Sequence, residues 1–76
     1  MIKNIIKDNN YEINIKNNFV HLKKYINIID INLNKISIKL SGCILIISGN
    51  DLIVCAMDEY EVVIKGHIKS IEFINE

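Results

Sequence analysis

The chain has 76 residues, which is enough for one domain with a small core. Half of its residues are apolar, and nine lysines balance nine acidic residues, so the formal net charge is zero. A nucleic-acid-binding protein normally presents a basic stripe, and arginine is absent here, so we expect no nucleic-acid partner. A domain this small leaves part of its apolar surface uncovered, which predicts association with a protein partner or with further copies of the chain.

The first ten residues are polar apart from three isoleucines, and they contain no apolar stretch of signal-peptide length. We expect residues 1–10 to be a flexible lead-in and residues 11–76 to form a single domain. The longest uncharged run, 40–50, is far short of the roughly 20 residues that span a bilayer. These features predict a cytoplasmic protein without direct membrane insertion, whose two cysteines stay reduced.

Short alternating segments fill the next part of the chain. Residues 11–15, 19–23 and 28–32 each read as a strand, because apolar and polar side chains alternate along them. Asparagine-rich stretches between them predict turns.

The centre of the chain, residues 36–57, contains three apolar runs separated by Ser41-Gly42 and by Gly49-Asn50-Asp51. Glycine between apolar runs is typical of hairpin turns, so the pattern predicts a tight antiparallel meander. A two-residue loop at Gly42 pairs Leu40 with Cys43, Ile38 with Leu45 and Ile36 with Ile47. The middle run, 43–47, has no polar side chain on either face, so we expect it to be covered on both faces.

After a charged turn at 58–61, residues 62–64 form a short strand, Lys65-Gly66 a turn or bulge, and residues 67–74 the last strand. A change of apolar phase predicts a β-bulge near Lys69-Ser70. The predicted fold class is all-β, a small antiparallel meander that forms a β-sandwich or roll of about seven or eight short strands. The residues predicted to shape its turns are Gly42, Gly49, Asn50, Asp51 and Gly66. The predicted core is Ile36, Ile38, Leu40, Cys43, Leu45, Ile47, Leu52, Val54, Ile64, Ile71 and Phe73.

Cys43 and Cys55 flank the Gly49 turn, which would place them nearly opposite each other in neighbouring strands. They could form a redox pair or a soft-metal site, or be two small buried apolar residues. A metal site needs about four ligands at tight local spacing, and none is seen, so we favour the last interpretation and expect no metal or cofactor.

His21 and His67 each precede, by two residues, a lysine on the same strand face, which indicates a solvated position. A catalytic histidine needs an orienting carboxylate and a nucleophile nearby, and no such constellation is visible. The acidic group Asp58, Glu59 and Glu61 lacks the alternate spacing and central glycine of a calcium loop, so a solvated turn is favoured. We therefore expect no catalytic residue and no enzymatic activity.

A longer pattern resembles a known family. In order, its residues are Val20, Leu22, Tyr25, Asn27 and Ile28; Ile36, Ile38 and Leu40; Leu45, Ile47, Gly49, Asp51, Leu52 and Val54; and Glu61, Val62, Val63, Ile64, Gly66, Ile68, Ser70, Ile71, Glu72 and Phe73. This pattern resembles the YabP/YqfC family of small sporulation proteins of Firmicutes, and is closer to the YqfC branch. The match covers about residues 12 to 74.

The resemblance implies a mother-cell protein with a structural or adaptor role at the developing spore envelope, and a sporulation membrane protein as its partner. It implies no enzymatic activity and transfers no functional residue, because the shared positions are those of the fold. The alternative function is a small β-barrel that binds a small ligand or nucleic acid. An exposed stripe of aromatic residues with lysines would favour that alternative.

Overall fold

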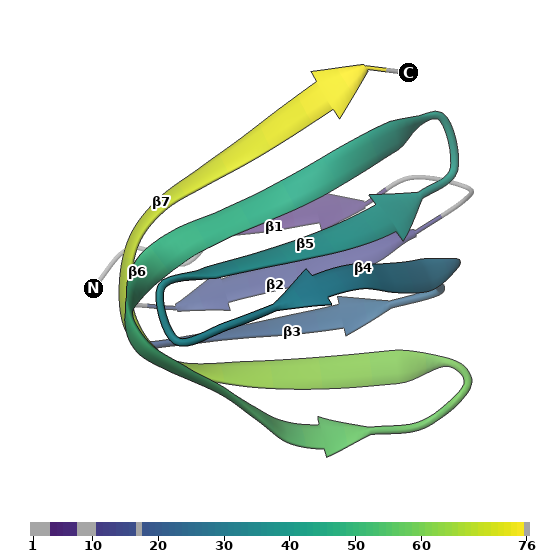
Figure 1. Ribbon diagram of the computed structural model, residues 1–76. Helices are drawn as coiled ribbons and strands as arrows, with labels where there is room; N and C mark the ends of the chain where they lie inside the picture. The colour runs from purple at the N-terminus through teal and green to yellow at the C-terminus, as the bar shows by residue number, and fades with distance from the viewer. Residues whose placement is uncertain (1–3, 8–10, 17, 76) are drawn as a thin grey trace.

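The computed structural model describes residues 4–7, 11–16 and 18–75, and these contain seven β-strands and no helix (Figure 1). The predicted all-β class is therefore confirmed. The strands are β1 (Asn4–Lys7), β2 (Glu12–Lys16), β3 (Phe19–Lys23), β4 (Asn27–Ile31), β5 (Lys35–Leu40), β6 (Cys43–Met57) and β7 (Glu61–Asn75).

All seven strands belong to one sheet with the order β1-β2-β3-β7-β6-β5-β4, and every neighbouring pair is antiparallel. The strands β6 and β7 are 15 residues long and bend sharply near their middles (Figure 1). The sheet thereby folds over itself into two layers. The first layer holds β4, β5, residues 43–48 of β6 and residues 70–75 of β7. The second layer holds β1, β2, β3, residues 61–65 of β7 and residues 52–57 of β6.

The hairpin at Gly42 has the predicted register. Leu40 pairs with Cys43, Ile38 with Leu45 and Ile36 with Ile47. Gly42 has φ of 84°, a conformation that glycine adopts at little cost. The hydrophobic pattern determines this register, because a shift by one residue would turn Lys39 toward the core.

The predicted turn at Gly49, Asn50 and Asp51 is wrong, because these residues lie inside β6, at its bend. At the bend the two long strands come unusually close: a Cβ on Gly49 would lie 2.0 Å from the carbonyl oxygen of His67. Gly49 is therefore required for close approach of two backbones, a second common use of glycine in strands.

Gly66 of β7 lies opposite a bulge in β6, formed by Asp51 and Leu52. Asn50 pairs with His67 and Ile53 with Lys65, so two residues of β6 face Gly66 alone. Gly66 has φ of 142°, and a Cβ there would lie 2.6 Å from the carbonyl oxygen of Asp51. Neither alternative for Lys65-Gly66 is correct, because both residues lie inside β7 and the bulge at this point is on β6. The predicted bulge near Lys69-Ser70 is confirmed, since Ser70 pairs with Ser48 and Ile68 with Gly49, leaving Lys69 unpaired.

The loop between β4 and β5 fastens the bend. The backbone N–H of Gly49 donates to the carbonyl of Asn34 at 3.0 Å, and that of Leu52 donates to the carbonyl of Leu33 at 2.9 Å. The loop itself is held by the Asn32 side chain, which accepts from the N–H groups of Asn34 and Lys35 at 2.9 and 2.8 Å. This asparagine-rich stretch therefore forms the predicted turn and also braces the bend.

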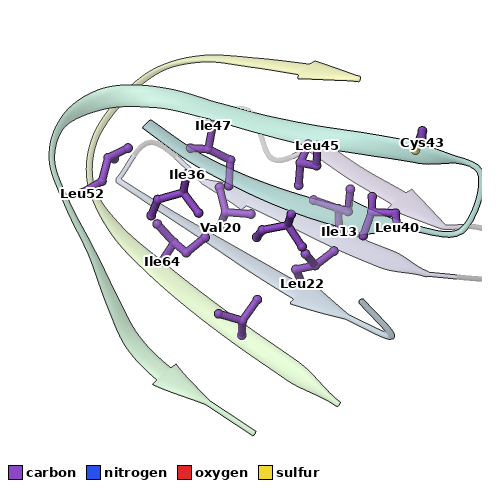
Figure 2. Close-up of a cluster of buried hydrophobic side chains, with 12 residues drawn as sticks. Ile13, Val20, Leu22, Ile36, Leu40, Cys43, Leu45, Ile47, Leu52 and Ile64 are labelled. Atoms are coloured by element: carbon purple, nitrogen blue, oxygen red, sulfur yellow. The ribbon is translucent and has the colours of Figure 1, made fainter. Parts of the chain in front are cut away.

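The core lies between the two layers, with side chains from both pointing toward one another (Figure 2). Of the predicted core residues, eight are buried: Ile36, Ile38, Leu40, Cys43, Leu45, Ile47, Leu52 and Ile64. Val54 and Ile71 are partly buried and pack against the core. The second layer supplies four buried residues that the predicted core omitted: Ile13, Val20, Leu22 and Val62.

Phe73 was predicted to be a core residue and is 41% exposed. It does face inward, because it pairs with buried Leu45, but it lies on β7 where that strand forms the edge of the first layer. An edge position leaves the flank of an inward side chain open, which explains the difference.

The prediction that residues 43–47 are covered on both faces is also wrong. Cys43, Leu45 and Ile47 are buried, whereas Ile44 and Ile46 are only partly buried on the outer face. No second sheet covers that face, because one folded sheet has a single interior. The cross-strand neighbours of Ile44 are Lys39 and Ile74, which shield it from the sides.

The expected lead-in at 1–10 is wrong for Asn4–Lys7, which form β1 and pair with β2. The remaining residues of that segment, 1–3 and 8–10, lie outside the described residues. In the part of the chain described here, no helix is long and apolar enough to cross a membrane.

Candidate functional site

Exposed aliphatic side chains gather along β4 and the connections at its two ends. Four of them, which we call the β4 rim, are Ile26 (58% exposed), Ile29 (52%), Ile31 (50%) and Leu33 (61%). Single exposed apolar residues are common on protein surfaces, but four within eight residues form a patch.

The β4 rim is exposed because of the position of β4 in the sheet. β4 pairs only with β5, so its other side is a free edge. The pairing passes from Ile28 and Ile38 directly to Asp30 and Ser37, which leaves Ile29 as a bulge. The bulge keeps part of the strand out of register with β5, as is usual where an edge is protected from uncontrolled strand pairing.

Residues 52–57 of β6 form the edge of the second layer and run beside β4 in the opposite direction. The two edges are joined at one end by the bond from Leu52 to Leu33, and at the other by the N–H of Lys24, which donates to the carbonyl of Tyr60 at 2.7 Å. Between these ties, no described Cα atom of β4 lies within 8 Å of one of β6. The two edges therefore do not pair with each other.

Acidic residues surround these two edges. Segments 25–34 and 51–60 contain four acids and no lysine: Asp30, Asp51, Asp58 and Glu59. All four side chains are exposed. The two segments are therefore acidic, although the exposed Lys24 and Lys35 flank the first of them directly. We call these four carboxylates the acidic border of the β4 rim; they complement a partner that offers apolar groups next to lysine or arginine.

Asp58 has a structural role in the turn between β6 and β7. Its Oδ1 accepts hydrogen bonds from the backbone N–H groups of Glu61 and Tyr60, each at 2.8 Å. These two donors, with that of Glu61 the stronger, lower the pKa of Asp58. The Tyr25 hydroxyl donates to the carbonyl of Asp58, which fastens the turn to the connection between β3 and β4. The acidic group is thus a turn, as predicted.

His21 has the carboxylate neighbour that the enzyme alternative requires. Its Nε2 lies 2.6 Å from Oε1 of Glu61, and the two side chains are 29% and 39% exposed. The sheet register places Asn14 and Val63 beside His21 on the neighbouring strands. Neither is a hydroxyl or a thiol, so the pair has no nucleophile next to it on the sheet.

His67 lies at the bend of β7 with an exposed side chain, opposite Asn50. The two histidines are therefore in different places on the sheet, His21 on the outer face of the second layer and His67 at the fold between the layers.

Cys43 and Cys55 were expected in neighbouring strands, and this is wrong because both lie in β6. Cys43 is buried near the start of the strand, with its Sγ 3.9 Å from the Tyr11 hydroxyl, and Cys55 is exposed near the end. The cause is the bend at Gly49: without a turn there, the chain does not reverse between the two thiols. Among the described residues, no group of three or more histidines, cysteines and acids is placed to hold a metal ion.

Aromatic side chains are distributed over separate parts of the molecule. Tyr11 contacts Cys43, Tyr25 contacts the turn at Asp58, and Lys16 lies over the ring of Phe19 at 5.1 Å from its centroid. The described strands thus offer no continuous row of aromatic rings for base stacking.

Sequence reasoning missed the β4 rim as a surface. It identified the strand but not its position at the edge, which depends on the pairing order of the whole sheet. The signal in the sequence is the run of apolar residues at 26, 28, 29, 31 and 33, which fits neither one face of a strand nor one face of a helix.

Together these features define a small, folded antiparallel sheet with free edges, one of which carries an apolar patch bordered by acids. No family model, curated protein or solved structure matches the chain.

Proposed function

We propose that this protein is a non-enzymatic interaction domain that docks onto a protein partner through the β4 rim. The observation that carries the proposal is the set of four aliphatic side chains, each half or more exposed, along one free edge. An exposed patch of this kind on a small domain is typical of a protein–protein contact.

The acidic border specifies the partner's chemistry. Four carboxylates and no lysine lie in the two segments that form the neighbouring edges. A partner surface with apolar side chains flanked by lysine or arginine would bury the rim and pair with the carboxylates. Such charge complementarity chiefly raises the rate of association and selects the partner.

The resemblance to the YabP/YqfC family gives the proposal its biological setting. The domain acts in the cytoplasm of the mother cell during spore formation, as an adaptor or structural part of the developing spore envelope. It reaches the forespore membrane peripherally, by binding a sporulation membrane protein. What supports this setting is the pattern of glycine and apolar positions along residues 12 to 74.

Two observations favour binding over catalysis and over nucleic-acid recognition. The His21–Glu61 pair lies on an open sheet face whose nearest cross-strand neighbours are an amide and an aliphatic side chain. Among the described residues, the lysines and aromatic rings do not form one stripe, and the net charge of the chain is zero.

A capture experiment from sporulating cells tests the proposal. The tagged protein is compared with an Ile26→Lys/Ile29→Lys variant, which reverses the polarity of the rim without touching the core. The matched control is Ile74→Lys, because Ile74 is 45% exposed on the outer face of the first layer, at the edge opposite the rim.

We expect the wild-type protein and the control to recover the same defined membrane or coat protein, and the rim variant to lose it. Equal recovery by all three proteins would contradict docking through the rim. Salt-sensitive retention of the purified protein on single-stranded DNA would favour the nucleic-acid alternative instead.

A further inference from the structure

The second half of β7, residues 70–75, is a free and regular strand edge. β3 pairs with β7 only from Glu61 to Lys65, so beyond the bend no described strand occupies the outer side of β7. On the side that faces β6 within the sheet, residues 70–75 pair with residues 48–43 of β6 without interruption.

The free edges of β4 and of residues 52–57 of β6 are interrupted. β4 has a bulge at Ile29, and the edge of β6 has one at Cys55, where the pairing passes from Val54 to Ala56. Bulges, prolines and charged side chains, lysine above all, are devices by which sheet edges avoid new strands. Residues 70–75 contain no bulge, lysine or proline, and their one charged residue, Glu72, lies on the outer face beside Ile46, so this edge is the best suited to accept a further strand.

The side chains on this edge show which surface the new strand would cover. Ile71 and Phe73 face inward, since they pair with the buried residues Ile47 and Leu45. Phe73 remains 41% exposed because nothing lies beside it at the edge. A strand added here with an apolar residue opposite Phe73 would extend the core of the first layer.

We propose that the added strand is β7 of a second copy, so that the protein forms a two-fold dimer through this edge. The first layers of the two copies then join into one continuous sheet with the order β4-β5-β6-β7-β7-β6-β5-β4. This symmetric arrangement satisfies both free edges at once and closes the assembly at two chains.

Symmetry and charge together select the register. In an antiparallel pair, residues opposite each other point to the same face, so the two-fold axis passes midway between the two copies of one residue. A centre at Glu72 would oppose two carboxylates directly, and a centre at Ile71 would bring the bulge at Lys69 into the pairing. A centre at Phe73 has neither fault. The Phe73 side chains of the two copies then lie opposite each other, Ile71 of one copy lies opposite Asn75 of the other, and Glu72 lies opposite Ile74.

This inference deepens the proposed function, and it rests on it only in that the protein works through contacts with other chains. The β4 rim lies at the opposite edge of the first layer, so it stays free in the dimer. Each copy would therefore present one rim, which makes the assembly a bivalent adaptor.

Two measurements on the purified full chain test the dimer. Sedimentation equilibrium up to about 1 mM should give twice the monomer mass of 8.8 kDa for the wild-type protein. Phe73→Lys places two like charges opposite each other and should raise the dissociation constant at least about tenfold. Ile53→Lys should leave it unchanged, because Ile53 lies away from this edge.

Cysteine cross-linking tests the register directly. Residues directly opposite in antiparallel strands have Cα atoms about 4.5 to 5.5 Å apart, within the range of a disulfide. In a Cys55→Ser background, Phe73→Cys should oxidise to a covalent dimer, and Ile53→Cys should not. Cys43 is buried and stays out of the reaction.

A monomeric wild-type protein, or a Phe73→Cys variant that does not cross-link, would overturn the dimer and leave docking through the rim intact. Dissociation caused by Ile26→Lys/Ile29→Lys but not by Phe73→Lys would also overturn it, by placing self-association at the β4 rim. Conversely, loss of partner capture by the rim variant with an unchanged dimer would support both proposals.

Discussion

Replacing Gly49 with alanine should destabilise the folded protein more than replacing Gly42, the glycine of the β5–β6 hairpin turn. The added methyl group would lie 2.0 Å from the carbonyl oxygen of His67 and 3.1 Å from the Cα of Ile68. Both of these atoms belong to the backbone of β7, so no side-chain rotation can relieve the clash.

The cost has two parts. Normal contact requires β6 and β7 to separate by more than about 1 Å at the bend, and overpacking of this kind costs about 1 to 3 kcal/mol. The separation also strains the 3.0 Å bond from the Gly49 N–H to Asn34, which contributes about 1 kcal/mol. The expected loss is about 3 kcal/mol, a large share of the roughly 4 to 11 kcal/mol typical of a chain of this size.

Gly42→Ala is the matched control. Gly42 has φ of 84° and no atom within 4 Å of its added methyl, so only conformational strain of about 1 to 2 kcal/mol is expected. Urea unfolding followed by circular dichroism measures both variants on the same scale. If Gly49→Ala loses no more stability than Gly42→Ala, the interpretation of Gly49 as a point of close backbone approach is wrong.

Three further predictions concern separate parts of the molecule. Leu45→Ala should cost about 2 to 5 kcal/mol in urea unfolding, because Leu45 is fully buried between the layers and its removal leaves a cavity; a loss under about 1 kcal/mol would contradict that packing. In the folded protein a thiol reagent should modify Cys55 rapidly and Cys43 only after denaturation, as mass spectrometry can show, and equal reaction rates would contradict the placement of the two thiols. Because its pKa is lowered on folding, Asp58 stabilises the folded state above its ordinary pKa of 3.8, and this contribution is lost as the pH falls through the folded-state value. Asp58→Ala should therefore be less stable at neutral pH and lose less stability on acidification than the wild-type protein; identical acid-unfolding curves would refute this role.

The local pattern of apolar, polar and glycine residues was sufficient to predict those features that depend only on residues close together in the sequence. The hairpin at Gly42 has a two-residue loop, and the alternation of apolar side chains on both sides of it permits only one register, so the pairing of Ile38 with Leu45 could be predicted. The acidic turn at Asp58 could likewise be predicted, because a short charged run between two apolar strands commonly forms a surface turn.

Local pattern failed where the structure depends on distant partners. A glycine between two apolar runs is compatible with a turn or with a bend inside one long strand, and only the presence of β7 along both halves of β6 distinguishes them. That one ambiguity misplaced Asp51 and Cys55 as well as Gly49. It also concealed which strands are edges, so neither the exposure of Phe73 nor the β4 rim could be predicted.

The candidate surface depends on the same information. Ile29 and Ile31 are apolar residues in a strand, and the sequence gives no sign that β4 ends the sheet order. The acidic border, by contrast, is visible in the sequence as two segments without lysine, although nothing there shows that the two segments are neighbours in space.

The sharing of β6 and β7 between both layers has a consequence for how the domain opens. In a sandwich of two separate sheets, one sheet can detach while the other keeps its hydrogen bonds, and amide exchange then reports two opening energies. Here the two longest strands cross from one side of the interior to the other, so loosening either side disturbs the same pair of strands. Amides in β3 and β5 should therefore exchange with one common free energy, as parts of a single cooperative unit.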